Sequence, residues 1–475
     1  MHASSRPSQI TLPAPEILVR PANLALIGIF IAINLGLLLI LDPAARIANG
    51  ADSGTWYGPA KALIEHGTLG SIDNPTIPSA DRGPIYPLLI AGLMAVAGPD
   101  YPALLAAVQA GLLLMVALLT AQIAAAYRPD NATLALGLVL LNPNLLGAAQ
   151  LVQSETVYVF ILTCMLFVIL RLIENFTTRN AIWLGALTGV AALIRPEGTF
   201  LIVCIPLLLL VIAAVQRHSE NVKTSWRQIG MMCAACVIAS CVVVAPWILR
   251  NAYAGIGFRL NEVQNSAHYA WGAVEQVTVT QTSKTFWEVP KIIEAERSRQ
   301  LEKFKGQHPG ASKKEIADRD FTNALTTLMS LPLIDHLKTI VKAKAEFLFA
   351  GGAGTWIGLL RGTGQTPIAM MKASGANSYW SGWLNAMSRY PIFELSLTAV
   401  ALGYVLVLRA CAVVGFFRTW RTNGLLLLIL CAEIAFHAFI QPYYGPSRFR
   451  LPVEPAFVLL AILALPVGRP KRAGA

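Results

Sequence analysis

Charged residues are scarce in this chain. Asp, Glu, Lys and Arg make up only 13% of its 475 residues, whereas a soluble domain has about 25%. Hydrophobic residues reach 55%, so a soluble fold would lack enough polar side chains to cover its surface. The shortage of charge therefore excludes an ordinary soluble domain and indicates an integral membrane protein.

Cysteine and histidine are also few, and neither forms a pattern of its own. All seven cysteines lie within or beside apolar segments, so we expect no disulfide framework. Cys233 and Cys236 have redox spacing, but in mid-membrane they are better interpreted as small packing residues. His66, His268 and His437 lack the spacing of a metal site. We predict no metal and no cofactor.

The net charge of +11 does not indicate nucleic-acid binding. Lys and Arg fall mostly between the hydrophobic segments, where the excess of positive charge in cytoplasmic loops would place them. Nucleic acid is therefore excluded as a partner, and the bilayer is the expected surroundings.

Long apolar runs cover most of the chain. They are continuous rather than alternating, which predicts transmembrane helices and not barrel strands. If the basic connections are all cytoplasmic, the chain is an all-α polytopic protein with about ten spans, in a range of about nine to twelve. The expected spans lie near 22–41, 102–126, 131–149, 154–173, 180–194, 197–215, 228–249, 391–416, 423–441 and 451–467.

This topology requires that the apolar stretch 84–98 does not cross the membrane. It is short, contains Pro84 and Pro87, and is better suited to a re-entrant or surface-lying helix. The chain then divides into a cytoplasmic tail 1–21, a transmembrane core 22–249 with an external loop 42–101, a second external region 250–390, C-terminal spans 391–467 and a cytoplasmic tail 468–475.

The second external region contains two helical patterns. Ser312 and Glu315 form a capping-box pattern that opens a helix running towards Pro332. The following segment 333–349 is amphipathic, with apolar residues on one face and Asp335, Lys338, Lys342 and Glu346 on the other. Such a helix suits the membrane interface or the surface of the protein's own external domain, and both interpretations stay open.

An acidic residue, Asp52, follows the first span by a few residues. A short helical pattern begins after it and ends at Gly67. Asp52 is therefore either a general base at the membrane surface or the N-cap of that helix. Pro59 counts against the N-cap, because a proline seven residues into a helix is expected to break it.

Four motifs together resemble the GT-C superfamily of membrane glycosyltransferases, in particular its protein-mannosyltransferase and lipid A aminoarabinose-transferase branch. They occur in the order of that family and are spread over most of the chain. The motifs are Asp52-Ser-Gly-Thr-Trp-Tyr57 with Arg82-Gly-Pro-Ile-Tyr-Pro87; Gln153-Ser-Glu155 with Gly185 to Arg195-Pro196; Ala245-Pro-Trp-Ile-Leu-Arg-Asn251; and Ser447-Arg-Phe-Arg-Leu-Pro452.

The resemblance implies an inverting transferase that moves a hexosyl or pentosyl unit from a polyprenyl-phosphate carrier. The acceptor would be an envelope glycan, a glycolipid such as lipopolysaccharide, or a protein, on the periplasmic face of a bacterial inner membrane. Asp52 matches the position of the family's base, and Asp81 and Asp73 in the same loop are alternatives.

Arginine suits the departing lipid phosphate, because its planar fork pairs with two oxygens at once. Several arginines fall on the predicted external side, against the positive-inside bias. Each could also be an anchor to lipid headgroups, and Glu155 could pair with one of them. The candidate phosphate or substrate ligands are Arg82, Arg448, Arg450, Arg195, Arg250, Lys61, Tyr57 and Glu155.

Two other functions share part of this pattern. A flippase or transporter of a lipid-linked sugar would have the same apolar composition, but it needs no carboxylate outside the first span. A glycan ligase or polymerase that uses a lipid-pyrophosphate donor would share the external site and use different loops. The acceptor and the sugar are not identified by the sequence.

Overall fold

The structure is a computed structural model that describes residues 19–50, 52–218, 225–282, 288–362, 388 and 390–466. The predicted cytoplasmic tails therefore lie largely outside the described residues. Within the described part, every regular element is a helix, as expected for an all-α membrane protein. The first half contains α2 (Pro21–Ile40), α3 (Pro43–Ala48), α4 (Ser53–His66), α5 (Ile85–Ala97), α6 (Tyr101–Tyr127), α7 (Ala132–Leu140), α8 (Pro143–Ala149), α9 (Glu155–Glu174), α10 (Thr178–Ile194), α11 (Gly198–His218) and α12 (Trp226–Tyr253).

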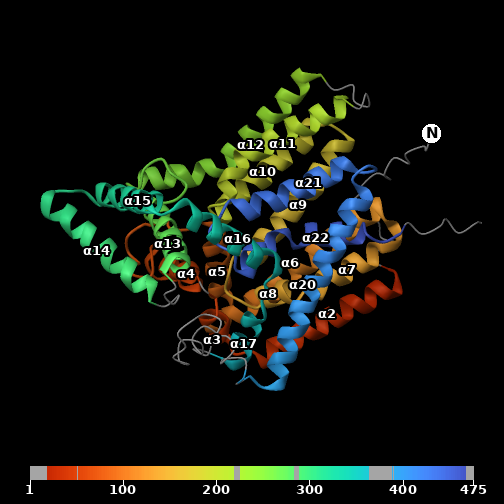
Figure 1. Ribbon diagram of the computed structural model, residues 1–475, viewed down its shortest axis with the longest axis horizontal. Helices are drawn as coiled ribbons and strands as arrows, with labels where there is room; N and C mark the ends of the chain where they lie inside the picture. The colour runs from red at the N-terminus through yellow and green to blue at the C-terminus, as the bar shows by residue number, and fades with distance from the viewer. Residues whose placement is uncertain are drawn as a thin grey trace, which may run out of the picture.

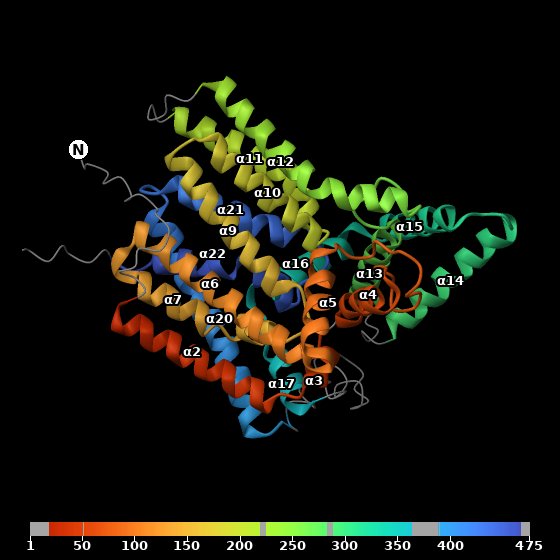
Figure 2. The same ribbon diagram turned by 180° about the vertical axis from the view of Figure 1, so that it is seen from behind.

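The second half begins with an arm of helices and returns to the bundle. It contains α13 (Val263–Thr282), α14 (Val289–Gln307), α15 (Lys313–Ser330), α16 (Leu333–Phe349), α17 (Ala353–Arg361), α20 (Ile392–Thr419), α21 (Gly424–Phe439), the 3₁₀ helix η3 (Ser447–Val453) and α22 (Glu454–Ile462). Figures 1 and 2 show that α13, α14 and α15 project from one end of the bundle, where α4 also lies.

The two regions predicted to be external therefore meet at the same end of the molecule. They also bond directly: the Glu262 amide donates to the Ala80 carbonyl over 3.1 Å, and the Ala80 amide donates to Glu262 Oε1 over 2.7 Å. This contact places the loop 42–101 beside the start of the second region.

Six helical segments of the described chain are long and apolar enough to cross a membrane, or seven if the bent pair α7 and α8 forms one span. One of the six joins α5 and α6 into a single segment. The apolar helices α10 and α21 are shorter. Each of the predicted spans coincides with one of these helices or with α22, and the count of about ten remains a prediction.

Close helix contacts inside the bundle depend on small residues. A Cβ added to Gly185 of α10 would lie 2.1 Å from the Cys236 carbonyl oxygen of α12. Ser240 on the same face of α12 donates to the Gly185 carbonyl over 2.9 Å. A glycine is needed here because the two backbones approach too closely for any side chain, a common way of packing helices in membranes.

Local predictions in the second region are confirmed, with one difference. Ser312 and Glu315 form the expected capping box at the start of α15, and α16 has the predicted bounds. However, Asp335 lies on the buried face of α16 with Phe347, while Leu333 and Val341 are 73% and 70% exposed. The buried face of α16 therefore contains both polar and apolar side chains, while other apolar side chains of the helix remain exposed.

The helix after Asp52 also differs from expectation. It continues through Pro59, which lies inside α4, and ends at Gly67 with a left-handed φ of 71°. The prediction that Pro59 would break the helix is wrong: α4 continues through Pro59, which is buried against the rest of the protein. The short apolar stretch at 84–98 becomes α5, whose Tyr86 and Ile90 are fully buried in the bundle.

Candidate active site

Asp52 lies in the turn between α3 and α4. It occupies the N-cap position of α4, but its carboxylate bonds to no backbone amide of that helix. The next residue, Ser53, donates from Oγ to the Val152 carbonyl over 2.9 Å, which ties this turn to the segment that precedes α9. The side chain of Asp52 is thus held at the helix start and remains available for other partners.

Two arginines from distant parts of the chain contact this carboxylate. Arg448 Nη1 donates to Asp52 Oδ2 over 2.9 Å, and Arg82 Nη2 lies 3.8 Å from Asp52 Oδ1. Arg82 is itself fixed, because its Nε donates to Thr55 Oγ1 over 3.0 Å and its guanidinium lies 4.9 Å from the Trp56 ring centre. The first loop and the segment before the last span therefore meet at this carboxylate.

The three charged groups differ in exposure. The side chains of Asp52 and Arg448 are 33% and 28% exposed, whereas that of Arg82 is 13% exposed. A ligand can therefore reach the carboxylate and the outer guanidinium directly. Arg82 is the most buried of the three groups.

The arginines also set the acidity of Asp52. Burial alone would raise its pKa, but the positive charges of Arg448 and Arg82, a hydrogen bond from Arg448 and the charge of Arg195 together hold the pKa below its usual value. Asp52 is therefore ionised at neutral pH. It can accept a hydrogen bond from a hydroxyl group, although the same arginines weaken it as a base.

A second cluster lies behind the first and centres on Arg195. Its Nη1 lies 2.9 Å from Glu155 Oε1, and its Nη2 lies 3.1 Å from Glu197 Oε1. Gln441 Nε2 donates to the same Glu197 oxygen over 2.7 Å. The predicted pairing of Glu155 with an arginine is observed. Glu197 was missed by the sequence analysis, although it directly follows Arg195-Pro196 and this position was the available signal.

Arg195 also interacts with Tyr158 and with Asp52. Its guanidinium carbon lies 5.9 Å from the centre of the Tyr158 ring, and its charge acts on Asp52. One carboxylate oxygen of Glu155, Oε2, is buried without a hydrogen-bond partner among the described residues. Buried polar atoms are nearly always paired, so this oxygen remains free to accept a further hydrogen bond.

Several of the predicted ligands lie outside these two clusters. Arg450 is fully buried, and its nitrogens bond to Glu454 Oε1 and to the carbonyls of Phe347 and Ala350. Arg250 donates to the carbonyls of Ser79 and, over 3.4 Å, of Leu69. Both arginines therefore hold the backbone of neighbouring segments.

The remaining candidates lie on or near α4. Lys61 forms an exposed ion pair of 3.7 Å with Glu65, and Tyr57 is half-buried on the same helix. Asp73 is exposed in the loop that follows, and the amide of Asp81 bonds to Ser79 Oγ over 3.1 Å. No group of three or more His, Cys, Asp or Glu residues in the described part of the chain is arranged to hold a metal ion.

One protein-family model matches the chain. Residues 81–247, about a third of its length, match the family described as dolichyl-phosphate-mannose-protein mannosyltransferase. The matched segment contains Arg82, Glu155, Arg195 and Glu197. This match confirms the resemblance to the GT-C superfamily that the motifs predicted.

No curated protein matches the sequence, but two solved structures are similar to it. The archaeal oligosaccharyltransferase AglB from Archaeoglobus fulgidus, in complex with an inhibitory peptide and a dolichol-phosphate, has 14% identity and a TM-score of 0.48. The alignment covers 93% of this chain and 50% of AglB, so this chain spans about half the length of that protein. ArnT from Cupriavidus metallidurans in the apo state has 14% identity and a TM-score of 0.39, with 93% of this chain and 77% of ArnT covered.

Proposed function

We propose, from its resemblance to the GT-C membrane glycosyltransferases, that this chain is an inverting glycosyltransferase. It moves a sugar from a polyprenyl-phosphate carrier to a hydroxyl of an envelope glycan, glycolipid or protein. We place the reaction at the periplasmic face of a bacterial inner membrane, where 42–101 and 250–390 form the external side. The observation that carries this proposal is the carboxylate of Asp52 held between Arg448 and Arg82.

In the proposed reaction, the acceptor oxygen attacks the anomeric carbon from the face opposite the phosphate. A new carbon–oxygen bond forms as the bond from that carbon to the phosphate oxygen breaks, so the configuration inverts. The acceptor proton passes to Asp52, and the lipid monophosphate leaves with the electron pair of the broken bond. Asp52 is already ionised for this role, because the arginines lower its pKa.

The arginines change partner during this cycle. In the structure, Arg448 and Arg82 face Asp52, and a phosphate monoester placed beside them would compete for the same donors. Guanidinium groups bind phosphate in a bidentate manner. As the arginines turn to the phosphate, Asp52 loses the charges that lower its pKa and becomes a stronger base. Donor binding would thus prepare the carboxylate for proton transfer.

A cellular experiment tests the activity and the base together. Envelope glycans and polyprenyl-linked sugars are compared by mass spectrometry among cells with the wild-type protein, the Asp52→Asn variant and no protein. The loss of one sugar from the same acceptor in both the variant and the deletion, with accumulation of its lipid-linked donor, would support the transferase. The same sugar present in the variant and missing only in the deletion would exclude Asp52 as the base.

The rival functions give different results in the same experiment. Accumulation of a complete donor that stays on the cytoplasmic leaflet would support the flippase and overturn the transferase. Accumulation of a whole glycan on lipid pyrophosphate would support a ligase or polymerase. The carboxylate between two arginines favours the transferase, because transport of a neutral or anionic sugar lipid has no need of a base.

A further inference from the structure

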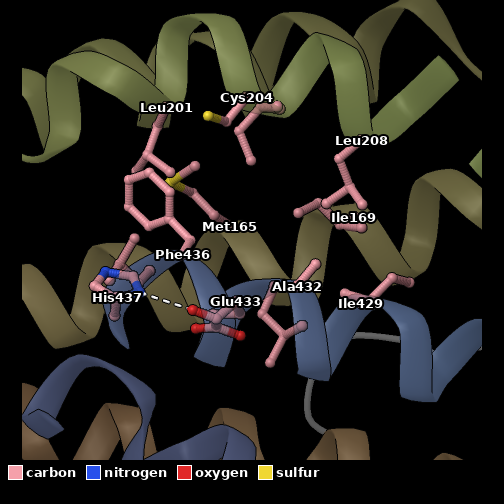
Figure 3. Close-up of a pocket in the computed structure, with 13 residues that line it drawn as sticks. Met165, Ile169, Leu201, Cys204, Leu208, Ile429, Ala432, Glu433, Phe436 and His437 are labelled. Carbon is pink, nitrogen blue, oxygen red and sulfur yellow. Dashed lines mark hydrogen bonds between the residues drawn. The ribbon is translucent and has the colours of Figure 1, made fainter. Parts of the chain in front are cut away.

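Two carboxylates inside the apolar bundle differ in how they are paired. Figure 3 shows Glu433 of α21 at an apolar pocket of about 100 Å³, where the His437 ring bonds to its backbone carbonyl. The carboxylate oxygen Oε2 of Glu433 has no hydrogen-bond partner among the described residues. Glu454, the first residue of α22, is fully buried, and both of its carboxylate oxygens accept hydrogen bonds. Charged groups inside a membrane bundle are costly and usually functional, so we expect a role for the fully paired Glu454.

Three side chains donate hydrogen bonds to Glu454. Its Oε1 accepts from Arg409 Nη2 of α20 over 2.7 Å and also from Arg450 Nε of η3. Its Oε2 accepts from the side-chain amide of Asn142, the N-cap of α8, over 3.2 Å. Arg409 and Arg450 are 5% and 0% exposed. The carboxylate therefore neutralises one of two buried guanidinium charges and joins α8, α20 and η3.

The same two arginines also bond to the end of α16. Arg450 donates from Nη1 to the Phe347 carbonyl over 2.7 Å and from Nη2 to the Ala350 carbonyl over 2.9 Å. Arg409 donates from Nε to the Leu348 carbonyl over 3.2 Å. The last carbonyls of a helix lack partners within the helix, and its dipole favours positive charge there. The two guanidinium groups are thus held between a carboxylate and a helix end.

The turn 350–352, which follows α16, lies against one face of η3. Gly352 has a left-handed φ of 75°, and a Cβ added to it would lie 1.6 Å from Asn144 Oδ1 and 3.0 Å from Ser447 Oγ. Ser447 and Arg450 are three residues apart, so they share one face of a 3₁₀ helix, and both contact this turn. Arg448 lies about 120° around the helix from that face, on the side of the candidate active site.

We propose that Glu454 is a positioning residue that fixes the direction of Arg448. By holding Arg450 against the end of α16, it sets the rotation of η3 and thereby aims Arg448 at the carboxylate of the candidate active site. The inference rests on the proposed function and deepens it, because it adds a residue that touches neither donor nor acceptor. Well-packed apolar residues can often replace a buried ion pair without loss of stability. A charged network, in contrast, has bonding directions that allow η3 one orientation.

A double-mutant cycle tests this role. Arg448→Ala, Glu454→Gln and their combination are compared with the wild-type full chain in phosphatidylcholine nanodiscs, and the dissociation constant of polyprenyl monophosphate is measured for each. Glu454→Gln should weaken binding by about threefold or more if it acts through Arg448, and the combination should bind as weakly as Arg448→Ala alone, within about twofold. Independent effects would multiply instead.

The pH profile adds a readout that a loss of stability alone would not move. Burial raises the pKa of Asp52, but the positive charges of Arg448, Arg82 and Arg195 hold it below its usual value. If Arg448 turns away, this pKa should rise, so the acidic limb of the kcat/KM profile should move to higher pH in Glu454→Gln. The combined variant should have its limb at the same pH as Arg448→Ala.

Asp320 on α15 provides a matched control. It is a buried carboxylate of the arm, 3% exposed, that accepts from Arg297 Nη2 over 2.6 Å and from Trp271 Nε1 over 2.8 Å. Asp320→Asn should lower the melting temperature, as Glu454→Gln should, because each leaves a buried donor without its charged partner. It should leave both the dissociation constant and the acidic limb at their wild-type values.

Two results would overturn the positioning role. One is a combined variant in which the two effects multiply, and the other is Glu454→Gln with wild-type binding and a wild-type acidic limb. If Glu454→Gln does not fold, Arg409→Met gives the same comparison, because it removes one partner of the carboxylate and keeps the pair with Arg450. It should change both readouts in the same direction and by a smaller amount.

The binding cycle requires no turnover, so this test and that of the proposed function fail in different ways. Coupled effects on binding in a protein that transfers no sugar would overturn the transferase and retain the positioning role. Sugar transfer with independent effects on binding would overturn only the positioning role.

Discussion

Arg448 and Asp52 form an ion pair of 2.9 Å although they lie 396 positions apart in the chain. The pair joins the turn after the first span to η3, which leads into the last helix. Arg82 adds a second positive charge at 3.8 Å. A partly exposed pair of this kind contributes little to folding, about 0–1 kcal/mol. We therefore propose that these three charged groups serve to bind a ligand rather than to stabilise the fold.

Removal of the carboxylate should abolish turnover and preserve donor binding. We expect Asp52→Asn to lower kcat by about 10²–10⁴-fold, the usual contribution of a general base. The affinity for polyprenyl monophosphate should stay equal or increase, because Arg448 and Arg82 lose their competing partner. Single-turnover assays and binding titrations check the two effects separately. Asp73→Asn, an exposed carboxylate in the following loop, is the control and should behave as wild type.

Removal of an arginine should affect binding first. Arg448→Ala and Arg82→Ala should each weaken the binding of polyprenyl monophosphate by roughly tenfold or more, since a hydrogen bond to a charged group is worth about 1.5–3 kcal/mol. Lysine at either position should restore only part of the affinity, because it cannot bind in a bidentate manner. Arg299→Ala, whose side chain is 76% exposed on the arm, should leave the affinity unchanged. A similar loss in this control would point to a general effect of charge.

The pH dependence of the reaction should follow the lowered pKa of Asp52. The folded protein holds this pKa below the ordinary 3.8, so the stabilising effect of the ionised carboxylate is fully present above about pH 3.8 and is lost as the pH falls through the lower, folded value. Asp52 should therefore cause no loss of kcat/KM between about pH 5 and 8 in the free enzyme. In Arg448→Ala the acidic limb of the kcat/KM profile should move to higher pH. An unchanged limb would mean that another group is the base.

Loss of Glu197 should disturb Arg195 without unfolding the protein. Breaking a buried ion pair costs about 3–5 kcal/mol, but Glu155 still pairs with Arg195 at 2.9 Å, so Glu197→Gln should fall below that range. We expect a lower melting temperature and a lower kcat/KM. Glu65→Gln, which breaks only the exposed pair with Lys61, should change neither. A variant with wild-type stability and activity would show that Gln441 and Glu155 are sufficient to hold Arg195.

Close packing of α10 on α12 gives a prediction about the fold. Gly185→Ala should strongly lower the melting temperature, because the added Cβ would lie 2.1 Å from the Cys236 carbonyl oxygen. Gly36→Ala on α2 has no atom within 4 Å of the added carbon and should be neutral or slightly stabilising, since alanine favours helix by about 1 kcal/mol. Thermal unfolding in detergent compares the two. Equal melting temperatures would mean that the helices separate easily.

By itself, the sequence determined the features that arise within one or two turns of chain. Apolar runs identified the helices, because a backbone in lipid must satisfy its own hydrogen bonds. The capping box at Ser312 and the end of α4 at Gly67 could also be predicted, because each depends only on residues that are neighbours in the sequence. The motif resemblance added Asp52, Arg82 and Arg448 as parts of one site.

Only the tertiary structure decided which charged residues face that site. Arg448 and Arg450 stand two apart in one motif, yet the first binds Asp52 and the second is buried with Glu454. In a 3₁₀ helix of three residues per turn, the side chains of residues two positions apart point about 120° away from each other, and the sequence does not show which of these directions faces Asp52. Glu197 shows the same limit. Its position beside Arg195 was visible in the sequence, but its second partner, Gln441, is 244 residues away, and contacts over that distance are set by how the helices pack.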